Sequence, residues 1–352
     1  MRIGILAPPW IPVPPPAYGG IEEVVDVLAR GLSELGHRVI LAAHPASTCP
    51  VERMPTVGLA SSGRIGDTQQ ELRHVADSYA AFEEQRVDIV HDHTVAGPVY
   101  ARRPEDLAVV TTVHGPFTAE MQRYFRSVPS NVGVVAISRH QARTAGSVKI
   151  DRTIYHGIDA EHIPPGDGAG GYLAFLGRMA PDKGVREAIE IARRAGVPLL
   201  IGAKMREVQE REYFAAVIEP LLGGTVEYLG ELGMREKFDL LRSAIAMVNP
   251  LRWSEPFGMV MIEAMAVGTP VIATPEGAAP ELIDDGVTGY LRRSVADLAA
   301  TISPAGDLDR SLVRAHILRH FTKQQMALNY ADYFHAVIGD RDQDFDRAAA
   351  GL

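Results

Sequence analysis

The chain lacks several features that would place a protein in a class at once. It has a single cysteine, Cys49, in 352 residues, so no internal disulfide can form, which fits a reducing compartment. No apolar run approaches the ~20 residues of a membrane-spanning helix, and the first apolar run is too short for a signal peptide. Lysine and arginine number 35 against 44 aspartates and glutamates, a net charge of −9. We therefore expect a cytoplasmic protein that binds no nucleic acid and contacts a membrane at most peripherally.

Two common nucleotide-binding patterns are missing as well. The stretch PPPAYGG at 14–20 lies between a strand-like run and a helix-like pattern, yet it matches neither G-x-G-x-x-G nor G-x-x-x-x-G-K-[ST]. A NAD-dependent dehydrogenase would need the first pattern after its first strand, so that class is disfavoured. Because neither nucleotide-binding pattern is present, the sequence does not show which group lies close to the backbone of the glycine pair Gly19-Gly20.

The length and the apolar pattern predict two α/β domains, because 352 residues are long for a single core. Apolar, β-branched runs such as 88–93 and 108–115 alternate with helical stripes, which is typical of a parallel sheet covered on both faces. The strand–helix–strand unit starts again at 171–178, after PPGDGAGG. We predict a Rossmann-like domain at 1–163, completed by a C-terminal helix at about 325–345, a linker at 164–171, and a second Rossmann-like domain at 172–324.

The densest group of chemically active residues lies in 249–274. A helix expected from Met259 to Ala266 is apolar nearly all round except for Glu263, so it should be buried. An unpaired buried charge costs several kcal/mol, and a helix N-terminus favours anions. Glu263 therefore pairs with an arginine, caps a neighbouring loop, or binds a ligand.

A second group lies in LGRMAPDKGV at 176–185. Arg178 ends a predicted strand and Lys183 precedes a predicted helix. Two cations at the carboxyl end of a parallel strand, beside a helix N-terminus, are typical of a phosphate or diphosphate site. The alternative is a pair of solvated surface charges.

These two stretches resemble the retaining glycosyltransferases of family 4. GRMAPDKG is similar to the family's G-R-x-x-x-x-K-G stretch, and EPFGMVMIE is similar to its signature of two glutamates separated by seven residues. HGID at 156–159 and the flanking AMAVGTPVIAT and GAAPELIDDGVTGYL also resemble the family. The chain departs from it at Ala278-Ala279, where relatives often have a glycine after Gly277. The resemblance implies the GT-B fold, an α/β architecture of two doubly wound Rossmann-like domains facing across a cleft.

The resemblance also implies an activity: transfer of a hexose from a UDP- or GDP-sugar to an acceptor hydroxyl, with retention of configuration and with no metal or other cofactor. Arginine, lysine and a helix N-terminus would stabilise the leaving diphosphate in place of a divalent cation. Arg178 and Lys183 would hold the diphosphate, Glu263 the ribose, and Glu255 the donor sugar. The other implied donor-binding residues are Phe257, Gly258 and Met259 at the sugar, Gly202 and Gly230 near the base, and Gly19 and Gly20 across the cleft.

In the first domain the resemblance places His114 against the donor sugar and adds it to Arg178, Lys183 and Glu255 as a catalytic candidate. A strand-end histidine bonded to backbone is the alternative. Tyr18, Asp92 and His93 are acceptor-side candidates, since strand C-termini open onto the cleft. Imidazoles and a carboxylate from VHDHT could in principle bind a metal. However, the alternation of a strand puts Asp92 on the face opposite the two histidines, and we expect no metal site.

Two other functions remain open at this point. One is a GT-B-fold nucleotide-sugar epimerase, and the other is a non-catalytic nucleotide-sugar-binding protein with the same binding pocket. A phosphorylase is disfavoured, because it would need a pyridoxal-binding lysine that we do not find. The expected partners are the nucleotide-sugar donor and a small-molecule, glycan or glycolipid acceptor, with the protein a monomer or homodimer. The basic stretches EMQRYFRSV and SRHQARTAGSVKIDR are either solvated faces or contacts for acidic lipid.

Overall fold

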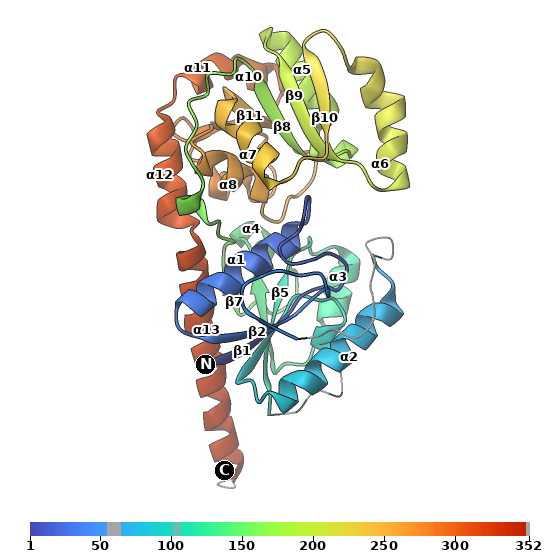
Figure 1. Cartoon of the computed structure of the whole chain (residues 1–352), viewed down its shortest axis with the longest axis vertical. Coiled ribbons are helices and arrows are strands. Elements are labelled where there is room, and N and C mark those ends of the chain that lie inside the picture. Colours follow the sequence, from blue (N-terminus) through green and yellow to red (C-terminus); the bar gives the residue numbers. More distant parts are fainter. Residues whose placement is uncertain (55–64, 101, 103, 105, 350–352) are drawn as a thin grey trace. The chain divides into compact units, whose positions relative to one another are not determined.

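Short runs rich in valine, isoleucine and alanine form most strands of two separate parallel sheets (Figure 1). The computed structural model describes residues 1–54, 65–100, 102, 104 and 106–349. By their contacts these residues form two units. Unit 1 comprises the described residues of Met1–Pro15 and Gly19–Gly157 and those from Lys323 onward, and unit 2 comprises Pro16–Tyr18 and Ile158–Thr322.

Unit 1 is built on a seven-stranded sheet in the order β3-β2-β1-β4-β5-β6-β7. Every strand pair in it is parallel, with Ile3 of β1 opposite both Val39 and Ile89. The strands are β1 (Arg2–Leu6), β2 (Arg38–Ala42), β3 (Glu52–Arg53), β4 (Ile89–Asp92), β5 (Ala108–Val113), β6 (Val132–Ala136) and β7 (Arg152–Thr153). The α-helices are α1 (Gly20–Glu34), α2 (Thr68–Glu84), α3 (Ala119–Phe125), α4 (Arg139–Thr144) and α13 (Lys323–Ala349), with a 3-10 turn η2 (Gly97–Val99).

Unit 2 repeats the plan with a six-stranded parallel sheet in the order β10-β9-β8-β11-β12-β13. Its strands are β8 (Leu173–Arg178), β9 (Leu199–Lys204), β10 (Val226–Gly230), β11 (Ala246–Asn249), β12 (Val271–Ala273) and β13 (Gly289–Leu291). Its α-helices are α5 (Val185–Ala195), α6 (Val208–Tyr213), α7 (Met234–Ser243), α8 (Met259–Ala266), α9 (Ala279–Leu282), α10 (Val295–Ala300), α11 (Ile302–Gly306) and α12 (Arg310–His320). Shorter turns are the 3-10 segments η3 (Ala160–His162), η4 (Pro181–Lys183) and η6 (Glu219–Leu221) and the π-helix η5 (Phe214–Ile218).

The strand order confirms the predicted doubly wound architecture in both units. The chain order reverses between β1 and β4 in unit 1 and between β8 and β11 in unit 2. In sheets of this kind, ligands bind beyond the carboxyl ends of the strands at that reversal. The residues to examine are therefore those that follow β8 and β11 in unit 2 and β1 and β4 in unit 1.

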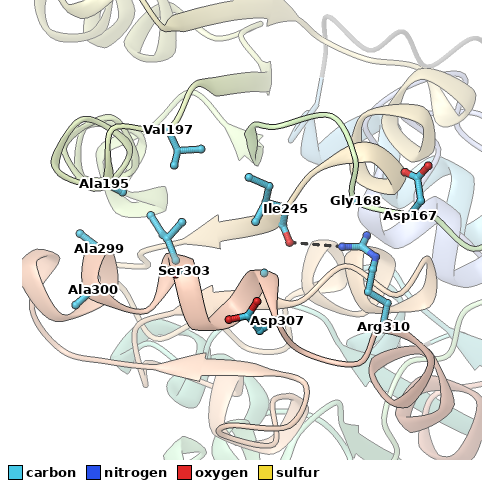
Figure 2. A pocket seen from close by; sticks show the side chains of 12 residues that line it. Asp167, Gly168, Ala195, Val197, Ile245, Ala299, Ala300, Ser303, Asp307 and Arg310 are labelled. Atoms are coloured by element: carbon cyan, nitrogen blue, oxygen red, sulfur yellow. Dashed lines mark hydrogen bonds between the residues drawn. The ribbon is translucent and has the colours of Figure 1, made fainter.

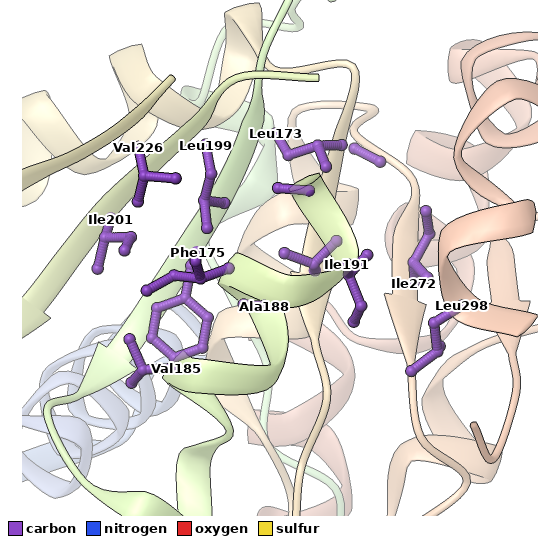
Figure 3. Packing of buried hydrophobic residues seen from close by; sticks show 14 of the residues in the cluster. Leu173, Phe175, Val185, Ala188, Ile191, Leu199, Ile201, Val226, Ile272 and Leu298 are labelled. Atoms are coloured by element: carbon purple, nitrogen blue, oxygen red, sulfur yellow. The ribbon is translucent and has the colours of Figure 1, made fainter. Parts of the chain in front are cut away.

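The core of unit 2 forms where α5 packs on the sheet (Figure 3). Phe175 of β8 lies between Val185 and Ala188 of α5, and all three side chains are completely buried. Burying a large apolar side chain contributes about 1.5–3 kcal/mol, so this layer holds α5 against β8. The loop between them carries Arg178 and Lys183.

Residues 164–171, which the sequence predicts as a linker, are held against unit 2. The amides of Gly166 and Gly168 donate to the carbonyls of Val267 (2.8 Å) and Arg242 (3.0 Å). The Arg310 guanidinium donates to the carbonyls of Gly166, Ala244 and Ile245, at 3.2–3.5 Å. A glycine-rich composition predicts a flexible segment, but here its amides bond to α7 and to the residue that follows α8, and these bonds hold it in place.

A pocket of about 650 Å³ lies beside this segment (Figure 2). Its lining includes Val197, just before β9, and Ile245, just before β11. It therefore opens at the amino-terminal edge of the sheet, away from the edge where parallel sheets bind ligands.

The long helix α13 belongs to unit 1. The Tyr330 hydroxyl lies 2.8 Å from the hydroxyl of Thr112 on β5. Gly31 of α1 allows close packing, because a Cβ atom there would lie 2.8 Å from the Cβ of Ala327. None of the helices in the described ranges is long and apolar enough to cross a membrane.

Asp92 ends β4 as a fully buried carboxylate. One oxygen accepts bonds from the amide and hydroxyl of Thr94 (2.8 and 2.7 Å), and the other accepts from the Tyr79 hydroxyl (3.0 Å). Burial raises the pKa of Asp92 to about 7, although the bonds from Thr94 and Tyr79 oppose that rise. Both oxygens are thus used inside the unit.

This buried carboxylate should make stability depend on pH. Between about pH 4 and pH 7 the folded protein holds the Asp92 proton more tightly than the unfolded chain does, so its contribution to the free energy of unfolding falls as pH rises, by at most about 1.4 kcal/mol per unit. We expect Asp92→Asn to become progressively more stable relative to the unmodified protein from pH 5 to about pH 7, and the difference to level off above that pH. Urea unfolding at four pH values measures this.

Buried histidines make the free energy of unfolding depend on pH in the opposite direction. They are present in both Asp92→Asn and the unmodified protein, so their contribution cancels when one free energy is subtracted from the other. Asp77→Asn, at a half-exposed carboxylate of α2, is the matched control and should run parallel to the unmodified protein. Parallel curves for Asp92→Asn as well would contradict the buried titration.

Candidate active site

Two loops meet at the carboxyl edge of the unit 2 sheet. One follows β8 and contains η4, and the other runs from β11 to α8. Gly184 has a φ of 76°, and a Cβ atom there would lie 2.0 Å from the carbonyl oxygen of Pro250. The amide of Arg252 donates to the carbonyl of Asp182 at 2.9 Å. These backbone contacts bring the two predicted motifs together although they are far apart in sequence.

The two predicted cations of the first loop lie close to carboxylates. Arg178 donates to Asp182 at 3.0 Å, and its guanidinium lies 3.9 Å from Glu210. The ammonium of Lys183 donates to a carboxylate oxygen of Glu255. The Arg178 side chain keeps 31% of its exposure and Lys183 keeps 12%, so both can be reached from solvent. Guanidinium and ammonium groups at such a place are the groups that bind phosphate oxygens in proteins.

Glu255 is positioned by its backbone as well as by Lys183. The amide of Ala278 donates to its carbonyl at 2.9 Å. Gly277 has a φ of 62°, and a Cβ atom there would lie 2.2 Å from the same carbonyl oxygen. Only glycine fits this close approach without displacing Glu255. The departure from the family pattern at Ala278 does not remove the contact, because it uses the backbone.

Glu263 is buried on α8, as the apolar character of that helix predicts. The ammonium of Lys237, on α7, donates to its carboxylate at 2.6 Å. The protein partner is therefore a lysine from another helix, which the sequence did not identify among the arginine, loop cap and ligand that it left open. Nothing in the α7 sequence distinguishes Lys237 from an ordinary surface lysine, and sequence reasoning missed it.

The other predicted residues of the second loop differ in accessibility. Phe257 is buried, with its ring 6.2 Å from that of Phe321, so its side chain packs into the core. Gly258 has a φ of 102° and precedes α8, whose first residue Met259 is half-buried. The sequence also missed Trp253, whose indole N–H donates to Glu255 at 3.0 Å.

The ends of β9 and β10 carry the residues predicted near the base. Gly202 is closely packed, because a Cβ atom there would lie 2.7 Å from Leu232 and 2.9 Å from Leu176. Gly230, with a φ of 85°, has open space where a Cβ would be. Lys204 is buried and donates to Glu207 and Glu210 at 2.8 and 3.2 Å.

Tyr18 belongs to unit 2 by its contacts. Its amide donates to Glu231 at 3.1 Å, and the Lys204 ammonium lies 6.0 Å from the centre of its ring. Desolvation of the hydroxyl raises the pKa of Tyr18 to about 12, against an opposing effect of Arg178. The phenol is therefore neutral at physiological pH.

The histidines predicted in unit 1 form a cluster of packed rings at the carboxyl ends of β4 and β5. Nδ1 of His93 lies 2.8 Å from Nε2 of His114. The ring of His156 stacks on His114 at a centroid separation of 5.3 Å, and the ring of His91 packs against His93 at 4.1 Å and an interplanar angle of 49°. Burial lowers the pKa of His91 to about 3 and of His114 to about 4, and it also lowers those of His93 and His156. All four rings are therefore neutral near pH 7.

The strand alternation predicted for VHDHT agrees with these contacts, because His91 and His93 share one face while Asp92 binds Tyr79 and Thr94. Among the described residues, no group of three or more His, Cys, Asp or Glu side chains is arranged to hold a metal ion.

The glycine pair of the opening segment starts α1. Gly19 is the N-cap in an extended conformation, and a Cβ atom there would lie 2.7 Å from the side chain of Pro15. Gly20 has open space at the same position. At Gly19 a side chain would collide with Pro15 of the same loop, so packing within the loop requires glycine there. At Gly20 packing does not require glycine.

Comparison with known proteins identifies the family. The model described as Glycosyltransferase Family 4 matches residues 18–162, and the model described as Glycosyl transferases group 1 matches residues 170–305. The phosphatidyl-myo-inositol mannosyltransferase of Mycolicibacterium smegmatis is 26% identical over 324 residues, which cover 83% of this chain and 80% of the relative.

Two solved structures are also similar. AviGT4, a glycosyltransferase involved in avilamycin A biosynthesis, superposes with a TM-score of 0.75 at 26% identity, over 96% of this chain and 98% of that one. Anabaena HepE in complex with UDP-glucose superposes with a TM-score of 0.72 at 21% identity, over 96% and 100% of the two chains. With both halves matched and the two doubly wound sheets in place, the chain belongs to the family 4 glycosyltransferases and has the GT-B fold.

Proposed function

We propose that this glycosyltransferase moves a hexose from a UDP- or GDP-sugar to a hydroxyl group of a glycan or glycolipid, with retention of configuration and without a metal ion. The observation that carries the proposal is the contact between Lys183 and Glu255 beside Arg178, at the edge of the sheet where doubly wound folds bind ligands. Two relatives support the donor and acceptor classes of the proposal. One is named for mannosyl transfer to phosphatidyl-myo-inositol, and HepE binds UDP-glucose in a structure of the same fold.

The charges at this edge suit a leaving diphosphate. As the bond between the anomeric carbon and the β-phosphate oxygen breaks, negative charge grows on that oxygen, and cations fixed beside it stabilise the transition state. Arg178 and Lys183 supply two positive charges for this purpose. Since their partners here are the carboxylates of Asp182 and Glu255, the diphosphate exchanges places with counterions that already hold both cations in position.

A single displacement on one face of the sugar retains the configuration and sets where the proton goes. The acceptor oxygen bonds to the anomeric carbon on the face that the diphosphate leaves, and the departing phosphate oxygen accepts the hydroxyl proton. Glu255 and Glu263 then serve to orient the donor through its hydroxyl groups, as carboxylates accept such bonds well. His114, neutral near pH 7, is available to bind a sugar hydroxyl.

The first test identifies the donor. A ligand present at 100 times its Kd stabilises a folded protein by about 2.7 kcal/mol. We expect either UDP and UDP-sugars or GDP and GDP-sugars, and not both sets equally, to raise the Tm in a thermal-shift panel. The shift should survive EDTA, because fixed cations rather than a metal hold the diphosphate. A panel with no shift, or a shift that EDTA abolishes, would contradict the proposal.

The second test removes the proposed site residues. Lys183→Ala should weaken donor binding and lower kcat/KM at least about 10²-fold, because it removes one of two charges on the leaving group. Glu263→Ala should act in the same direction by removing the proposed ribose contact. Arg194→Ala is the control, since Arg194 is an exposed cation of α5 paired with Glu190 and remote from β8's carboxyl end. Near-normal kinetics for Lys183→Ala would rule out the assigned site.

The third test separates backbone strain from positioning. Gly277→Ala and Gly286→Ala both place a side chain at a positive φ, which costs about 1–2 kcal/mol. Only the Cβ atom at Gly277 would meet Glu255, because nothing lies within 4 Å of the one at Gly286. Both variants should therefore lower the Tm, but only Gly277→Ala should lower turnover. Equal turnover in the two would show that the position of Glu255 does not matter.

A further inference from the structure

Trp253 lies in the loop between β11 and α8 and contacts both proposed site residues. Its indole N–H donates to Oε2 of Glu255 at 3.0 Å. The Lys183 ammonium lies 4.3 Å from the centre of its ring and also donates to Oε2 of Glu255. One tryptophan thus binds the cation through its face and the carboxylate through its edge. We call these three residues the Lys183–Trp253–Glu255 cluster.

The cluster leaves one oxygen of Glu255 available. Both donors reach Oε2, and in the described part of the chain no hydrogen bond is made to Oε1. The Glu255 side chain is 14% exposed, so that oxygen is neither surrounded by bulk water nor closed off. A carboxylate held at one oxygen and free at the other can accept a bond from a ligand hydroxyl at a defined place.

The backbone around Trp253 is fixed independently of its side chain. Gly184 contacts the Pro250 carbonyl, the Arg252 amide donates to the Asp182 carbonyl, and the Arg252 guanidinium donates to Glu187 of α5 at 2.7 Å. The loop therefore stays in place without the indole. The indole holds the long, flexible side chains of Lys183 and Glu255 each in one rotamer. Immobilising such side chains costs conformational entropy, and here that cost does not have to be met when a ligand binds.

We propose that Trp253 is a positioning residue for donor turnover, which holds Lys183 and Glu255 in one arrangement and releases Lys183 from its ring when a diphosphate binds. This inference rests on the proposed function and deepens it, because it gives a role at the same site to a residue outside the two stretches GRMAPDKG and EPFGMVMIE. Cation–π contact and a charge-assisted bond act on different parts of the ring, so substitutions can separate them.

Kinetics of two variants test the positioning role. Trp253→Phe keeps a ring face for Lys183 but has no N–H for Glu255, so we expect kcat to fall about tenfold with the donor KM within about twofold. Trp253→Leu loses both contacts and should lower kcat and raise KM. A merely structural residue would give lower thermal stability in both variants with no such split. Wild-type kcat and KM in Trp253→Phe would overturn the inference.

Fluorescence gives a second, direct readout. Trp10 and Trp253 are the two tryptophans of the chain, and Trp10 is buried in unit 1. In Trp10→Phe, Trp253 is the sole tryptophan, and with selective excitation of the indole, titration with UDP or GDP should change its emission over the concentrations that raise the Tm. If Trp10→Phe does not fold, the emission of the unmodified protein minus that of Trp253→Phe reports the same change.

The outcomes distinguish this inference from the function on which it rests. A nucleotide-dependent rise in Tm with unchanged Trp253 emission would overturn the role of Trp253 and leave the glycosyl-transfer proposal standing. No rise in Tm with any nucleotide or nucleotide-sugar would overturn both. A rise in Tm together with the emission change and the split in kcat and KM would support both.

Discussion

Charge pairing at one edge of a parallel sheet is the interaction on which the proposed site depends. The cations at the carboxyl edge of unit 2 lie against carboxylates: Arg178 with Asp182, Lys183 with Glu255, and Lys237 with Glu263. Taking a charge out of water is costly unless a partner compensates it, and these pairs allow charged groups to be half-buried before any ligand arrives. The cations are therefore already in position when a ligand phosphate binds, and the phosphate only has to displace the carboxylates that pair with them.

A second constraint is steric and lies in the backbone. The pairs form because the loop after β8 touches the loop after β11 at Gly184 and Pro250, and because Gly277 fits against Glu255. Both contacts leave no room for a Cβ atom. Glycine at these positions therefore serves the geometry of the charged residues.

The sequence predicted the parts of this arrangement that periodicity and burial control. The doubly wound sheets, the buried α8 and the need of Glu263 for a partner all follow from apolar patterns within one segment. The partner Lys237 and the role of Trp253 did not follow, because each depends on a contact between loops or helices distant in sequence. Gly202 shows the same limit: its glycine fits the packing of Leu232 and Leu176, which no local pattern reveals. The local sequence of segment 164–171 predicts a flexible linker, because the hydrogen bonds that hold it go to residues far along the chain and leave no local pattern.

The helix α13 has a consequence for how the molecule is made. Unit 1 begins at the N-terminus but includes α13, whose Tyr330 binds Thr112 in the middle of its sheet and whose Ala327 packs against Gly31. Unit 2 ends at Thr322, before α13 starts. During synthesis the ribosome therefore releases every residue of unit 2 before it releases the helix that completes unit 1. The half of the protein that is translated first is the half that finishes folding last.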